Sequence, residues 1–370
     1  MTVKTIAVLG GGPAGAAAAL ALARGGAAVD LYRPARPGEK PCGGAVPSHV
    51  LPRLAGFDPE PLPAVRSPAA TLENARGGRV DLALRDLRIF RRGDLDAALV
   101  AAAAAAGARL VPRRADRVAS DDRGVTVASG GEARRYAWAI GADGAGGLAR
   151  RSAGLPPPAA SVGVGASLSG IAWDRLVLAF PGLADAYLWI FPRPGGASVG
   201  IAYSAGTLEA AVAERALAAF LDRHLSPGWR DLPGPRYRFP IPVWSESTLP
   251  GVRGALGRRL LLAGDAAALA DPLTREGIRY GMLSGHWAAE SLLAGRPERY
   301  AERLDDELGG EMERAERAAR LFYEGPVGQW MVPFARLHPG IRRVLGDLLA
   351  CRQPYRGLTR RLLRAGAGFA

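Results

Sequence analysis

The chain opens with an order of apolar segments and glycines that is typical of a βαβ unit. Residues 5–9 read TIAVL and residues 27–32 read AAVDLY, two short apolar runs suited to buried strands. Between them, a run of small apolar residues ends at Arg24 and is long enough for a helix. The pattern therefore predicts a strand, a glycine loop, a helix and a second strand in that order.

Three glycines, Gly10, Gly12 and Gly15, form a G-x-G-x-x-G between the first strand and the helix. The first permits a tight turn, the second lets a pyrophosphate approach the backbone, and the third lets helix and strand pack closely. An acidic residue usually ends the second strand and holds the ribose, but Arg33 stands there and Asp30 comes three residues early. Either Arg33 contacts a phosphate instead, or the acid comes from elsewhere.

The same domain continues beyond the βαβ unit. Arg92 stands just before a predicted helix that includes the alanine-rich residues 97–106. Residues 136–141, YAWAIG, form an apolar strand that leads into Asp143 and Gly144. A strand that ends in such a turn belongs at the ligand-binding edge of a parallel sheet.

From about residue 153 the pattern changes to short segments in which apolar and polar residues alternate. These segments predict antiparallel strands, interrupted by a helix over about 208–221. Apolar strand and helix patterns return later, and the end of the chain is charged and helical. We expect an α/β (α+β) fold in four parts. They are a Rossmann-type domain (1–152), an inserted antiparallel-sheet substrate domain (153–253), a return segment of the Rossmann-type domain (254–296) and a C-terminal helical region (297–370).

The composition and charge of the chain indicate which kinds of binding partner to expect. Of 370 residues, 48% are hydrophobic and 22% are charged, and no apolar stretch is long enough to span a bilayer. The net charge of +13 favours anionic partners such as membrane surfaces. We expect no nucleic acid, because no reading module is present. Two cysteines, Cys42 and Cys351, and a strand that starts at once without a signal peptide predict a cytoplasmic protein.

Several motifs together resemble the geranylgeranyl reductase family, within the flavoproteins shaped like para-hydroxybenzoate hydroxylase. They are GGGPAG, KPCGGAVP, IGADGAGG, AYLWIFP, LLLAGDAAALADPLTREGI and CRQPYRGLTRRLL, spread over nearly the whole chain. Two positions depart from the family pattern: Arg275 stands where glycine is usual, and Ala184 stands where proline is usual.

The resemblance implies that the Rossmann-type domain binds FAD. Asp265 would accept hydrogen bonds from ribityl hydroxyls, and Gly277 would open a helix that faces the flavin pyrimidine carbonyl. No metal site is expected. The predicted cofactor-binding residues are Gly10, Gly12, Pro13, Ala14, Gly15, Arg33, Cys42, Gly43, Arg92, Ala115, Asp143, Gly144, Gly264, Asp265, Pro272, Gly277 and Ile278.

The family reduces carbon–carbon double bonds of isoprenoid chains, which requires a hydride from the flavin and a proton. The resemblance thus implies an apolar prenyl-type substrate, with NADPH as a candidate electron donor. Tyr187, Trp189 and Phe191 alternate, so they share one strand face and either wall a cavity or form plain core. Cys42 either donates the proton or simply packs by the flavin. The predicted catalytic residues are Cys42, Tyr187 and Trp189.

Other functions remain open at this point. An FAD-dependent monooxygenase or hydroxylase acting on an aromatic substrate would need a polar pocket, and a tailoring flavoprotein would act on a partner polypeptide. A halogenase fits less well, because such enzymes need a pocket lysine and only Lys40 stands near the motifs. Peripheral membrane contact, weakened by salt, is predicted from five arginines near the end of the chain. They are Arg342, Arg343, Arg360, Arg361 and Arg364.

Overall fold

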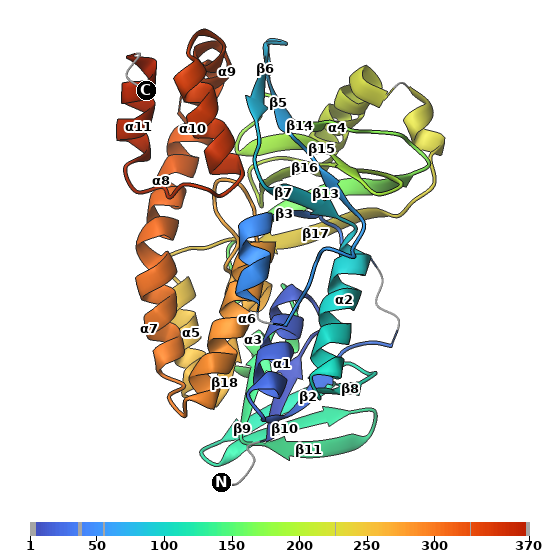
Figure 1. Cartoon of the computed structure of the whole chain (residues 1–370), viewed down its shortest axis with the longest axis vertical. Helices are drawn as coiled ribbons and strands as arrows, with labels where there is room; N and C mark the ends of the chain where they lie inside the picture. The colour runs from blue at the N-terminus through green and yellow to red at the C-terminus, as the bar shows by residue number, and fades with distance from the viewer. Residues whose placement is uncertain (1–4, 36–38, 55, 226, 326, 368–370) are drawn as a thin grey trace.

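The computed structural model describes residues 5–35, 39–54, 56–225, 227–325 and 327–367 (Figure 1). A five-stranded parallel sheet in the order β18-β12-β1-β2-β8 forms the centre of the first domain. Most of its strands are buried, as their continuous apolar runs predict. The bounds are β1 (Thr5–Leu9), β2 (Ala28–Tyr32), β8 (Arg109–Val111), β12 (Trp138–Gly141) and β18 (Leu260–Leu262).

Helix α1 packs between α2 and α6 beside this sheet (Figure 1). A small antiparallel sheet, β11-β10-β9, contacts β1 and β12. The predicted strand–helix–strand order and the helix through the alanine-rich stretch are confirmed. The bounds are α1 (Pro13–Arg24), α2 (Arg92–Ala105), α3 (Leu148–Ser152), α6 (Ile278–Leu293), β9 (Arg117–Asp121), β10 (Gly124–Ser129) and β11 (Glu132–Tyr136).

The centre of the second domain is a seven-stranded sheet in the order β17-β13-β16-β15-β14-β5-β6. Its pairs are antiparallel except β14 with β5. Strands β5 and β6 come from outside the 153–253 segment, and they extend the sheet because β5 pairs with β14 and β6 pairs with β5. The bounds are β5 (Ala69–Asn74), β6 (Arg79–Ala83), β13 (Ala160–Ser169), β14 (Leu176–Phe180), β15 (Ala186–Arg193), β16 (Gly196–Ser204), β17 (Arg236–Pro242) and α4 (Ala210–Leu225).

Short elements connect the two domains, and the C-terminal helices pack against β5 and β6 (Figure 1). In the parts of the chain that the structure describes, no helix is long and apolar enough to cross a membrane. The remaining bounds are β3 (Ala45–Pro47), β4 (Ala64–Arg66), β7 (Leu87–Phe90), η1 (Ser48–Arg53), η2 (Pro227–Asp231), η3 (Gly264–Ala267), η4 (Asp305–Gly309), α5 (Thr248–Leu256), α7 (Arg299–Leu304), α8 (Gly310–Tyr323), α9 (Val327–Leu337), α10 (Pro339–Leu349) and α11 (Leu358–Gly366).

The contact between α1 and α6 yields a stability prediction. A Cβ at Gly285 would lie 2.0 Å from the carbonyl oxygen of Ala14, whereas a Cβ at Gly281, one turn earlier, would meet nothing closer than 3.7 Å. We expect Gly285→Ala to lower the unfolding free energy by about 2–3 kcal/mol through overpacking. Gly281→Ala should leave it unchanged or raise it by up to about 1 kcal/mol, because alanine favours helix. Urea unfolding measures both, and equal midpoints would contradict the close contact.

Candidate functional site

The first wall of the site is the turn between β1 and α1. Gly10 has a φ of +106°, and a Cβ there would lie 2.3 Å from the Ala142 carbonyl oxygen, so the turn requires glycine. At Gly12 a Cβ would meet nothing within 4 Å, which leaves this backbone open. Gly12 caps α1 without a side-chain hydrogen bond, and the Ala16 N–H donates to the Gly12 carbonyl, so the N–H groups of Ala14 and Gly15 are the ones that can bind a phosphate.

The return segment forms the second wall. Gly264 and Asp265 follow β18, and the Asp265 carboxylate lies 2.5 Å from the Lys40 ammonium nitrogen. Gly277 makes no side-chain cap at α6, but the Glu276 carboxylate accepts the Arg279 N–H, so this helix end can present the N–H groups of Ile278 and Tyr280 to a ligand. These residues and the α1 turn line one cavity of about 970 Å³.

Arg92 and the loop before β3 form the third wall. Arg92 is the first residue of α2 and pairs with Asp96 at 3.1 Å. Burial lowers the pKa of its guanidinium, but Asp96 and Cys42 beside it more than offset that effect and raise the pKa. The Cys42 sulfur accepts a hydrogen bond from the Gly44 N–H at 3.3 Å. Arg92, Cys42 and Gly43 all line the cavity, which puts the thiol beside a buried cation.

Arg33 lies outside the cavity lining. Its side chain runs along the glycine turn, where a Cβ at Gly11 would lie 2.9 Å from the Arg33 Cδ. The nearby acid, Asp30, accepts hydrogen bonds from Arg109 Nε at 2.6 Å and from the Tyr136 hydroxyl at 2.5 Å. Asp30 is therefore engaged within the sheet, and a contact between Arg33 and a phosphate stays a prediction.

Five other predicted residues also lie outside the lining: Gly10, Gly15, Asp143, Pro272 and Ala115. Asp143 turns toward its own chain and accepts a hydrogen bond from the Ala149 N–H at 3.0 Å, while its neighbour Gly144 reaches the cavity. Burial raises the pKa of Asp143 despite that hydrogen bond. Pro272 is buried, and Ala115 packs against the main core. Their link to a cofactor stays a prediction.

This half of the cavity fits FAD. The glycine turn leaves open backbone where a pyrophosphate needs close approach, and α1 directs its N-terminus there. Asp265 supplies a carboxylate for ribityl hydroxyls, and the α6 N-terminus can face a pyrimidine carbonyl. In the parts described, no cluster of three potential metal ligands is found.

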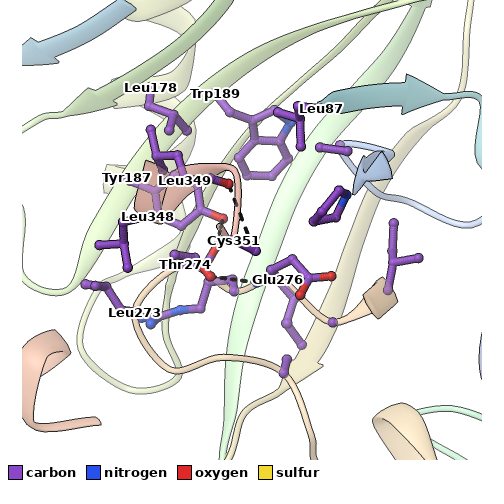
Figure 2. A pocket seen from close by; sticks show the side chains of 18 of the residues that line it. Leu87, Leu178, Tyr187, Trp189, Leu273, Thr274, Glu276, Leu348, Leu349 and Cys351 are labelled. Carbon is purple, nitrogen blue, oxygen red and sulfur yellow. Dashed lines mark hydrogen bonds between the residues drawn. The ribbon is translucent and has the colours of Figure 1, made fainter. Parts of the chain in front are cut away.

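The other half of the cavity is apolar, and Figure 2 shows several of its residues around one space. Tyr187, Trp189 and Phe191 on β15 all line it, as their alternation predicts. Trp189 donates its ring N–H to the Ser198 hydroxyl at 3.2 Å, and its ring lies over Gly200, where a Cβ would come within 2.4 Å of Cη2. The Tyr187 hydroxyl donates to the Thr274 carbonyl at 3.3 Å, and burial raises the Tyr187 pKa. Leucines complete this half: Leu72, Leu84, Leu87, Leu176 and Leu178.

Sequence reasoning missed several polar residues of the lining, among them Glu276 and Cys351 (Figure 2). Glu276 accepts a hydrogen bond from the Arg279 N–H at 2.7 Å, yet burial raises the pKa of its carboxyl. Cys351 has a φ of 53°, and burial raises its pKa to about 12. The C-terminal motif was recognised as family-like, but no spacing in the sequence connects residue 351 with residue 276.

Arg275 is the departure from the family pattern that the structure explains best. Its φ is 59°, a left-handed conformation that disfavours a side chain. Its guanidinium is nevertheless buried, with an NH2 nitrogen 2.6 Å from Asp185 and its carbon 5.1 Å from the centroid of the Tyr323 ring. Arg275 therefore ties the loop before α6 to the start of β15 and to the end of α8.

Comparison with known proteins agrees with this geometry. The digeranylgeranylglycerophospholipid reductase 2 of Methanopyrus kandleri is 30% identical over 354 residues, covering 86% of each chain. The geranylgeranyl diphosphate reductase of Rhodobacter capsulatus is 30% identical over 312 residues, covering 78% of this chain and 74% of the relative. No protein-family model matches the chain.

Among solved structures, a geranylgeranyl bacteriochlorophyll reductase-like protein of Thermoplasma acidophilum superposes with a TM-score of 0.73. The alignment covers 98% of this chain and 99% of that one at 20% identity. This likeness confirms the predicted fold class, a Rossmann-type domain with an antiparallel sheet domain and a C-terminal helical region. The cofactor that these findings support is FAD.

The first prediction for this site concerns Asp265. Asp265→Ala removes a charged hydrogen-bond acceptor and leaves Lys40 without its partner, so FAD affinity should fall about tenfold to a hundredfold. Flavin absorbance per protein and titration with FAD measure the loss. The matched control is Asp306→Ala on an exposed helical surface, which should bind FAD normally. Equal FAD affinity of the two variants would remove Asp265 from the cofactor site.

A second prediction concerns backbone strain at Arg275. Both Arg275→Gly and Arg275→Ala remove the pair with Asp185, but only glycine adopts the left-handed conformation without cost. The glycine variant should therefore be more stable than the alanine variant by about 1–2 kcal/mol, the reverse of the order inside a helix. Urea unfolding of the two variants measures the difference. An alanine variant of equal or greater stability would show that this conformation carries no strain.

Proposed function

The chain belongs to the geranylgeranyl reductase family, and from this premise we propose that it reduces carbon–carbon double bonds of an isoprenoid chain. It is an FAD-dependent oxidoreductase. One observation carries the proposal: the half of the cavity that fits FAD continues without interruption into the apolar half lined by Tyr187, Trp189 and Phe191. A long apolar chain in that half would lie next to the cofactor.

Bound and reduced, FAD supplies the hydride for this chemistry. An isolated double bond offers a protein little to polarise, so orientation in a dry cavity must provide most of the effect. The Trp189 ring and the leucines hold the chain and exclude water. We assign proton donation to the Cys42 sulfur, because it lies beside buried Arg92 in the half that fits FAD. We also assign the Tyr187 hydroxyl to the reaction, as a second group that carries a proton.

The remaining parts of the proposal concern partners and location. We propose NADPH as electron donor and a cytoplasmic protein that contacts membranes peripherally through its C-terminal arginines. The arginine-rich composition of the last helices supports this contact, since each cationic side chain near an anionic surface contributes about 1 kcal/mol. A monooxygenase acting on an aromatic or polypeptide substrate is the outcome that would replace the reductase proposal.

The test is reduction of a prenyl substrate by the purified protein and its Trp189→Ala variant. Mass spectrometry should show a gain of two hydrogens per reduced bond with the wild-type protein. Trp189→Ala should keep FAD but lose most of this activity, because Trp189 shapes the apolar half, and Trp189→Phe should recover part of it. A hydroperoxyflavin and no prenyl reduction in the wild-type protein would assign it to the monooxygenases.

A further inference from the structure

The exposed apolar side chains of this protein are concentrated at one place. Among the residues that the structure describes, eight large apolar side chains are exposed, and six of them belong to the C-terminal helices or the end of α8. A surface this apolar normally has a partner. The six are Leu321, Val327, Trp330, Phe334, Leu337 and Leu363, here called the apolar rim, with exposures between 47% and 74%.

The apolar rim surrounds the mouth of the cavity. All of its members except Leu337 line the cavity while also being exposed, so they lie where the cavity meets solvent. Along α9, Val327, Trp330, Phe334 and Leu337 follow helical spacing and form one outward stripe. The opposite side of α9 buries Val332 and Ala335, so the stripe is a surface feature and not misplaced core.

Cationic residues accompany the apolar rim. Residues 327–367 contain eight arginines and a single acidic residue, Asp347. Arg336, Arg343, Arg360 and Arg364 among them are exposed. Exposed apolar side chains and exposed arginines on the same C-terminal helices match an anionic bilayer, whose head groups attract the arginines while its acyl region accepts the apolar side chains. A second copy of this chain fits poorly, because it would bring the same cations into contact.

We propose that the apolar rim docks on an anionic bilayer, so that the prenyl chain of the substrate passes from the membrane directly into the cavity. This inference rests on the proposed function, since it requires that the substrate is an isoprenoid chain that can enter the cavity from a bilayer. The cavity is apolar on its inner side and its mouth is apolar on its outer side, so a chain entering from the bilayer stays out of water throughout. The cationic residues hold the mouth against the head groups.

The test uses the FAD-loaded full chain and vesicles of phosphatidylcholine with or without phosphatidylglycerol. Wild-type protein should sediment with the anionic vesicles and dissociate as salt rises. Leu337→Glu places a negative charge on the rim outside the cavity lining, and Trp330→Ser with Phe334→Ser removes two apolar anchors. Both variants should bind vesicles at least about tenfold more weakly. The matched control is Leu293→Ser, an exposed leucine far along the chain from the rim, which should bind as wild type.

Activity separates this proposal from the proposed function. Leu337→Glu should keep its FAD and reduce a short, water-soluble prenyl diphosphate at the wild-type rate, but lose reduction of a prenyl lipid embedded in vesicles. Wild-type protein that reduces the soluble substrate without binding vesicles would overturn the docking proposal and leave the function intact. A wild-type dimer that Leu337→Glu dissociates, again without vesicle binding, would assign the rim to a second copy. Vesicle binding without reduction of either substrate would contradict the function instead.

Discussion

Three backbone segments meet around the start of α1, and they meet only because no Cβ stands between them. A side chain at Gly10 would collide with Ala142, one at Gly15 with Gly10, and one at Gly285 with Ala14, in each case against a carbonyl oxygen within 2.3 Å. This contact brings the strand ends and the N-termini of α1 and α6 to one cavity. Two positive helix ends aimed at the same space favour an electron-rich ligand such as a dinucleotide. This packing therefore determines where the cavity lies and which helix ends face it.

Cationic residues are paired in the cavity wall, whereas the excess positive charge lies on the outer surface. In a chain with a net charge of +13, the cationic residues of the cavity wall are paired: Lys40 with Asp265, Arg92 with Asp96, and Arg275 with Asp185. Because unpaired buried charges are costly, this pairing keeps the wall close to neutral and suits it to an apolar chain. The excess of arginine lies instead on outer surfaces such as the C-terminal helices, where water and head groups can solvate it.

Local pattern predicted the first domain well. The glycine turn, α1 and β2 follow from short-range rules, and the alternation of Tyr187, Trp189 and Phe191 placed all three on the cavity side. Pairing between distant segments escaped prediction, because β5 joins β14 across about a hundred residues and no turn links them. The cavity residues Glu276 and Cys351 were missed for the same reason. Asp30 stands three residues before the position where a ribose-binding acid is usual, and in the structure it instead accepts hydrogen bonds from Arg109 and Tyr136 on neighbouring elements.

The helices that complete the cavity are less firmly held than its base. Helix α11 has no fully buried residue and α9 buries only Val332 and Ala335, whereas α6 buries most of its length against α1. Local opening costs less free energy where little apolar surface is buried. Local opening of the cavity is therefore expected to cost less free energy at α9 and α11, which carry its mouth, than at the closely packed α1 and α6. Arg275 limits how far such opening spreads, because its buried guanidinium contacts Asp185 and Tyr323 where the helical region meets the loop before α6.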